Sequence, residues 1–181
     1  MTLDLFAERG ATMSPDRVYR YRLWRTWGDP SQRIVFVGLN PSTADESEDD
    51  PTIRKCIGFG KRWGFGRLDM LNLFAVRSTD PGGLPTDLER AIGPCNDEAL
   101  TSAMTSAARV VWAWGSPALA RVRRMIAVRL DFWVNLPAGT VEHGTLGPRL
   151  LSGAPRHPLM LAYTTPFLRE GSVTAGAKNV R

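Results

Sequence analysis

Two side chains that could direct water attack and bond cleavage lie in short loops stiffened by proline. Asn40 follows the apolar run 33–39 and precedes Pro41, and His157 follows Arg156 and precedes a second proline. An asparagine amide donates and accepts hydrogen bonds at once, so Asn40 could hold a water molecule or read the edge of a base. An imidazole held in a stiff loop could stabilise a developing anion. The alternative roles are a simple turn in which Asn40 bonds its own backbone and a packing role for His157.

The loop after residues 33–39 offers further binding groups. Gly38 allows close approach of a ligand to the backbone, and Leu39, Pro41 and Ser42 complete the loop. Ligands of open α/β sheets bind beyond the carboxyl ends of the strands, which makes this loop the first candidate for a site.

An acidic run follows, at Asp45, Glu46 and 48–50. Such a run could hold a divalent metal through oxygen ligands, but a solvated loop that ends in a helix N-cap is the more common case, and we expect no metal. Cys56, Cys95 and two distant histidines do not have the spacing of a zinc site. The Gly-rich phosphate loops and the serine elbow of hydrolases are absent from the sequence, and we expect no cofactor.

The chain is basic, with a net charge of +5 and a pI of about 9.8. A basic surface attracts polyanions, and cations interleaved with aromatic rings suit a strand of nucleic acid. The alternative is a solvated helix face above core aromatics. The candidate nucleic-acid contacts are Lys55, Lys61, Arg62, Arg77 and Arg121.

Low cysteine content and the lack of a secretory signal or a long apolar run predict a cytoplasmic protein that does not bind membranes. We expect one domain over residues 1–181, with a core at about 17–168 and a flexible tail at 170–181.

Alternating apolar runs and helix starts give the element order strand, helix, strand, helix, strand, helix, strand. The pattern predicts an edge strand at 18–25, and helix starts at Asp50 and Asn96 and after Pro117. The expected fold is a three-layer α/β/α domain with a central, mostly parallel four-stranded sheet. Its strands are predicted at 33–39, 68–74, 109–114 and about 144–151, with another possible strand at 132–134.

The stretches 35–45 and 153–159 resemble the bacterial and phage family DUF1643, whose function is unknown. The segments 50–52, 72–74 and 112–115 fit the same pattern. The resemblance covers about residues 17–168.

A more distant resemblance is to the uracil-DNA glycosylase superfamily, in the order Gly-Leu-Asn-Pro-Ser, a strand with Asn72, Trp-Gly and His-Pro. It implies a glycosylase-like sheet in which Asn40 orients water and His157 stabilises the departing base. We also expect Asn72 and Arg156 to bind the substrate, and Phe59 is the candidate ring for stacking on the base.

These patterns lead to three hypotheses. The first is a DNA glycosylase-like enzyme that hydrolyses the N-glycosidic bond of a standard or modified base in DNA or a nucleotide. The second is a module that binds nucleic acid or a nucleotide without cleaving it, and the third is a protein-interaction domain that has kept only the scaffold. We expect a monomer whose partner is DNA or a nucleotide.

Overall fold

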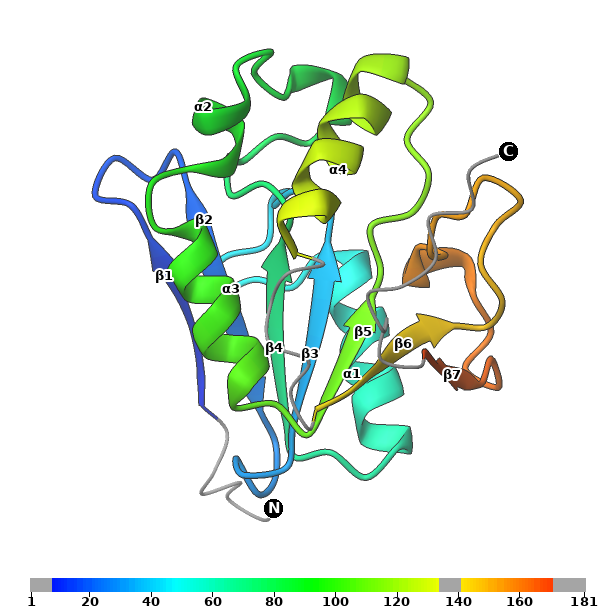
Figure 1. Cartoon of the computed structure of the whole chain (residues 1–181). Helices are drawn as coiled ribbons and strands as arrows, with labels where there is room; N and C mark the ends of the chain where they lie inside the picture. Colours follow the sequence, from blue (N-terminus) through cyan, green and yellow to red (C-terminus); the bar gives the residue numbers. More distant parts are fainter. Residues whose placement is uncertain (1–7, 134–140, 171–181) are drawn as a thin grey trace.

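The computed structural model of the chain describes residues 8–133 and 141–170 (Figure 1). A single mixed sheet runs through it in the order β1-β2-β4-β3-β5-β6-β7. Its strands are β1 (Arg9–Met13), β2 (Arg20–Thr26), β3 (Arg33–Gly38), β4 (Arg67–Asn72), β5 (Arg109–Trp112), β6 (Glu142–Leu146) and β7 (Phe167–Arg169).

The expectation of a four-stranded, mostly parallel sheet is wrong. Strands β4, β3, β5 and β6 pair in parallel, but β1, β2 and β7 add three antiparallel pairings at the two sides. Strand β2 is not an edge, because β1 covers it. The missed strands β1 and β7 are short and largely exposed, so they lack the apolar pattern that marks a strand in a sequence.

Helices cover both faces of the sheet. They are α1 (Pro51–Arg62), α2 (Leu88–Ile92), α3 (Asn96–Thr105) and α4 (Ala120–Trp133), with 3₁₀ turns η1 (Pro81–Gly83) and η2 (Pro158–Met160). The predicted cap at Asp50 is confirmed, since its side chain accepts a hydrogen bond from the Ile53 amide at 2.8 Å. The expected strand at 132–134 is wrong at 132–133, which end α4, and residue 134 lies outside the described residues.

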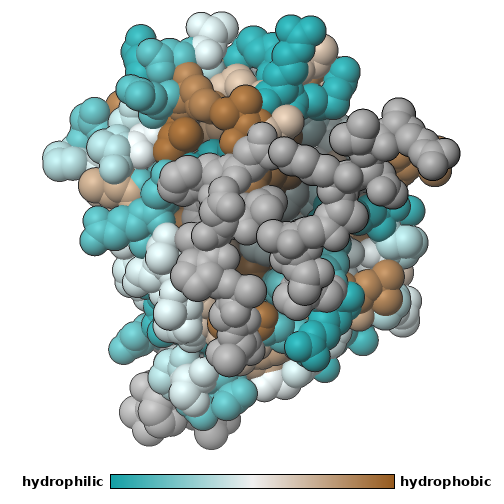
Figure 2. Space-filling model, viewed as in Figure 1, coloured by the Kyte–Doolittle hydropathy of each residue, from teal (hydrophilic) through white to brown (hydrophobic). Residues whose placement is uncertain are grey.

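Alternate residues of β3 enter two separate cores, as a central strand requires. Val35 and Val37 pack with side chains of α3 and α4, whereas Ile34 and Phe36 pack with side chains of α1. On the face shown in Figure 2 the described residues are mostly hydrophilic or neutral, with a hydrophobic patch between α2 and α4. None of the helices in the described ranges has the length and apolar character needed to cross a membrane.

A buried carboxylate ties the central strands together. Asp69 on β4 is completely buried and lies between Arg22 of β2 at 2.5 Å, Arg67 at 3.0 Å and Arg33 of β3 at 3.2 Å. Removing one member of such a group leaves buried charges without a partner, so the group fixes the pairing of β2, β4 and β3.

We predict that Asp69→Asn lowers the free energy of unfolding by about 3–5 kcal/mol, the usual effect of breaking a buried ion pair. Urea denaturation measures it. The matched control is Glu170→Gln, which breaks the partly exposed pair with Arg149 and should change stability by about 1 kcal/mol or less. Equal effects of the two substitutions would contradict the proposed role of Asp69.

Candidate functional site

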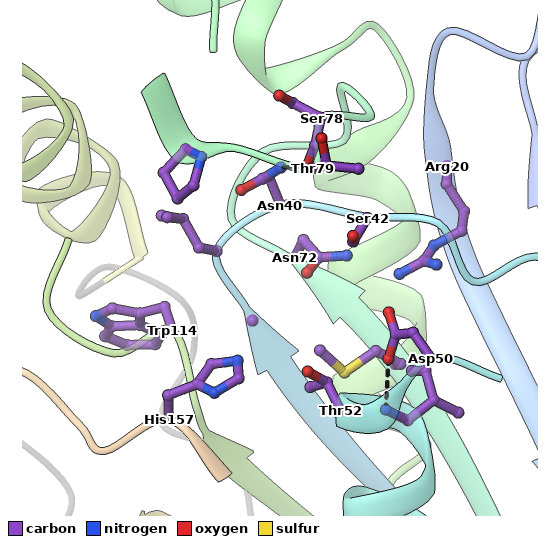
Figure 3. Close-up of a pocket in the computed structure, with 15 residues that line it drawn as sticks. Arg20, Asn40, Ser42, Asp50, Thr52, Asn72, Ser78, Thr79, Trp114 and His157 are labelled. Atoms are coloured by element: carbon purple, nitrogen blue, oxygen red, sulfur yellow. Dashed lines mark hydrogen bonds between the residues drawn. The ribbon is translucent and has the colours of Figure 1, made fainter. Parts of the chain in front are cut away.

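A cavity of about 240 Å³ lies at the carboxyl ends of the central strands (Figure 3). Its walls come from the ends of β3 and β4, the loop after β5, the start of α1 and the loop before η2. Pockets for drug-sized ligands usually occupy about 300–1,000 Å³. The cavity therefore has room for a single small ligand.

The topology explains why a cavity forms here. From β3 the chain passes to α1 on one face of the sheet, and from β5 it passes to α4 on the other face. Because β3 and β5 are neighbours, their loops separate above the sheet. A crevice at such a switch point is the common ligand site of open α/β sheets.

Asn40 lines the cavity from the loop after β3. Its Nδ2 donates to the Ser78 carbonyl at 2.7 Å and to the Pro41 carbonyl at 3.1 Å. These bonds to the loop after β4 hold the side chain in place and leave Oδ1 as the atom that can accept a hydrogen bond from a ligand or water.

His157 lines the same cavity from the far end of the chain, and its ring is directed into it (Figure 3). Its Nδ1 accepts a hydrogen bond from the Leu159 amide at 3.3 Å, so the neutral ring carries its proton on Nε2. Gly115, at φ +70°, lets the loop after β5 pass close beside it, because a Cβ there would lie 3.2 Å from the Cβ of His157.

The pKa of His157 is lowered from its usual value of 6.5, mainly because partial removal from water disfavours the charged ring. The negative charge of Asp50 acts in the opposite direction. The ring is therefore neutral at pH 7 and offers an N–H group.

Asn72 lies at the end of β4 beside Gly38. Its side chain is only 2% exposed, and its buried Nδ2 has no hydrogen-bond partner among the described residues. A Cβ at Gly38 would come within 2.7 Å of Asn72 Oδ1 and 2.6 Å of Met70 Cε. The glycine thus makes room for a buried amide that lines the cavity with an unused donor.

The opposite end of the cavity carries two charged groups, Arg20 and Asp50 (Figure 3). Arg20 is 2% exposed and donates to the Ala44 carbonyl at 2.5 Å. Burial lowers the pKa of Arg20 to about 10, so it remains charged at pH 7. Asp50 combines the N-cap of α1 with a place in the cavity wall.

Comparison with known proteins identifies the family. A family model described as "Protein of unknown function (DUF1643)" matches residues 20–159. The chain belongs to the DUF1643 family. The match runs from Arg20 past His157, so it includes every residue that lines the cavity.

A search of curated proteins and a search of solved structures found no match to this DUF1643 protein. The more distant resemblance to uracil-DNA glycosylases therefore has no support from these comparisons.

The structure brings most of the predicted substrate residues of the DUF1643 protein to one cavity. Those that line it are Gly38, Leu39, Asn40, Ser42, Asn72 and His157. Pro41 does not line it, but its carbonyl accepts a hydrogen bond from the Ser78 amide. Arg156 also lies outside the lining and donates to the Pro148 carbonyl at 3.0 Å.

Phe59 cannot stack on a base from its place in the structure. Its ring is completely buried under α1 and packs against Trp63 and Tyr163. The aromatic side chain that lines the cavity is Trp114, which follows β5 on the side of His157. The sequence shows the Trp-Gly pair, but only the fold shows that this residue reaches the cavity, where it is 6% exposed and otherwise packs in the core with side chains of α3 and α4.

The predicted nucleic-acid contacts do not form one surface. Lys55 and Arg62 lie over the ring of Tyr163, and Lys61 lies over Trp27. Arg121 donates to the carbonyls of Gly82 and Leu84, both at 2.8 Å. Arg77 acts electrostatically on Arg20, and its buried Nε has no partner among the described residues.

Tyr163 also connects the loop of His157 to α1. It packs directly on Gly58, where a Cβ would lie 2.4 Å from the ring. The helix that starts at the cavity thus also supports the segment that follows His157.

The acidic run has structural roles. Asp45 accepts hydrogen bonds from the amides of Ser47 and Glu48, and Asp49 pairs with Arg25 at 2.7 Å. In the described ranges, no group of three or more histidine, cysteine or acidic side chains is placed to hold a metal ion.

We predict that NMR titration gives His157 a pKa below 6.5, and that Asp50→Asn lowers it further by removing the charge that raises it. Asparagine caps helices as well as aspartate does, so α1 should stay intact. His143→Gln identifies the resonance by elimination. A His157 pKa that Asp50→Asn leaves unchanged would show that these two groups do not share the cavity.

Proposed function

We propose that this protein hydrolyses the N-glycosidic bond of a nucleobase, standard or modified, carried by DNA or by a nucleotide. The observation that supports the proposal is the meeting of Asn40 and His157, from distant parts of the chain, in one small cavity. A water-positioning amide and an imidazole donor are the two groups that this reaction needs on opposite sides of the bond.

In the proposed reaction, the oxygen of a water molecule forms a bond to C1′ of the sugar while the bond from C1′ to the base nitrogen breaks. The electron pair of that bond leaves with the base, and the proton that the water loses is taken up through solvent by the base anion, which gives the sugar hydroxyl and the neutral free base. The sugar becomes positive and the base negative in the transition state.

Three side chains of the cavity match these charges. Asn40 Oδ1 accepts a hydrogen bond from the attacking water, and the Nε2–H group of His157 donates to the departing base. The carboxylate of Asp50 faces the positive charge on the sugar. A donor aimed at a developing anion is worth about 3 kcal/mol in a site that excludes bulk water.

The lining adds further contacts for a base. The small exposed part of Trp114, which is 6% exposed, contributes apolar surface beside His157 (Figure 3). The unused Nδ2 of Asn72 adds a donor to this lining. If the base comes from DNA, it must first leave the stack, which costs a few kcal/mol.

The test is incubation with oligonucleotides that contain uracil or modified bases, and with the corresponding free nucleosides and nucleotides. Chromatography detects a released base, and alkaline cleavage detects abasic sites. We expect release by the wild-type protein and a rate lower by about 10²–10³-fold in Asn40→Ala and His157→Ala, as for loss of one donor to an oxyanion.

His143→Gln is the matched control, because this histidine lies on β6 outside the cavity lining and its loss should leave the rate unchanged. Retention of nucleic acid or nucleotide without any released base would favour the binding module instead. Release that survives in both Asn40→Ala and His157→Ala would overturn the assignment of the site.

A further inference from the structure

We infer that the Arg20 end of the cavity binds a phosphate group, and that the ligand is therefore a free nucleoside 5′-phosphate rather than a base within a polymer. The inference rests on the proposed function for the base end of the cavity. It concerns the opposite end, of which the proposed reaction uses Asp50 and not Arg20.

The first observation is the incomplete bonding of Arg20. Its side chain is 2% exposed and lines the cavity, and its buried Nε has no hydrogen-bond partner among the described residues. The Ala44 carbonyl accepts a hydrogen bond from Arg20, but it is a neutral group and does not balance the positive charge of the guanidinium. Among those residues, no carboxylate lies within 4.0 Å of it in an ion pair.

Another buried arginine of this protein, Arg25, has more hydrogen-bond and ionic partners than Arg20. Arg25 is about as buried but pairs with Asp49 and donates to four backbone carbonyls, those of Gly10, Trp24, Asp45 and Glu48. Arg20 forms no ion pair within 4.0 Å in the described part of the chain, although the charge of Asp50 acts on it, and a bound anion would offset the remaining cost of burying its charge. Arg20 therefore has the character of a binding group rather than of a structural one.

The surroundings of Arg20 favour an anion with several oxygen atoms. Ser42 and Thr52 add hydroxyl groups, and the first turn of the 12-residue helix α1 reaches the same wall. A helix N-terminus attracts negative charge. Arg77 and Arg25 act on Arg20 with positive charge and Asp50 and Asp45 with negative charge, so these four groups cancel and the charge of Arg20 itself remains.

The burial of Arg20 decides between a free nucleotide and a polymer. Phosphates of a DNA strand lie outside a small cavity and are reached by exposed side chains, as in most phosphate contacts. A guanidinium that is 2% exposed can meet only a phosphate that enters the cavity itself. Trp114 and His157 lie on one side of the cavity and Arg20 on the other (Figure 3), so a bound nucleotide would place its base at the first side and its phosphate at the second.

Calorimetric titration of the wild-type protein tests this without any substitution. The probes are the 2′-deoxynucleoside 5′-monophosphates (of uracil and the four standard bases), the matching nucleosides, and a short oligonucleotide with a 5′-hydroxyl group, all at physiological ionic strength. We expect at least one monophosphate to bind about tenfold or more tightly than its nucleoside, as charge-assisted bonds to phosphate predict.

Substitutions then show which residue causes the preference for the monophosphate over the nucleoside. Arg20→Gln should make nucleoside and monophosphate bind alike, Arg20→Lys should keep part of the difference, and Arg123→Gln, on the exposed face of α4, should keep all of it. Melting curves and nucleoside affinity show whether each variant is folded. Equal binding of nucleoside and monophosphate by the wild-type protein, or tighter binding of the oligonucleotide, would overturn the inference.

The experiments can contradict either of the two proposals without contradicting the other. Monophosphates that bind through Arg20 but release no base would support the phosphate site and contradict the hydrolase. Base release from the oligonucleotide alone would support the hydrolase and contradict the phosphate site.

Discussion

The cavity depends on one close approach, that of the Asn72 amide to Gly38 at the ends of two adjacent parallel strands. The register of β3 against β4 places these residues side by side, and the absence of a Cβ at Gly38 lets a buried amide stand where the sheet ends. The loops that carry Asn40 and Ser78 then meet above this pair and bond to each other. Any larger residue at position 38 would have to displace both the amide of Asn72 and the side chain of Met70.

Much of this arrangement was predictable from the sequence because it rests on local signals. The apolar run that forms β3, the proline that ends it and the aspartate that starts α1 all act over a few residues. The resemblance pointed to Asn40 and His157, and the fold brings both to one cavity. The contacts that could not be predicted from the sequence are those between residues far apart in the chain. Arg20 reaches the cavity only because β2 pairs antiparallel beside β4, and no spacing in the sequence encodes that pairing.

The wrong predictions about Phe59 and about the number of strands arose for the same reason, since the three-dimensional fold decides both. The resemblance left Phe59 as the candidate stacking ring, but its position on the inner face of α1 buries it. The sheet was expected to have four strands because its outer strands β1 and β7 are only five and three residues long. Edge strands are often short, since a short edge discourages pairing with other chains, and the same shortness conceals them in a sequence.

The contact of Tyr163 with Gly58 has a consequence for the dimensions of the cavity. One rigid helix supplies part of the wall at its first turn and, two turns later, anchors the segment that follows the histidine. The separation of the two sides is therefore set by a stretch of regular secondary structure and not by the conformation of a loop. A family member that binds a bulkier ligand would need a different contact between this tyrosine and the helix. A different residue at position 58 would be the first sign of that change.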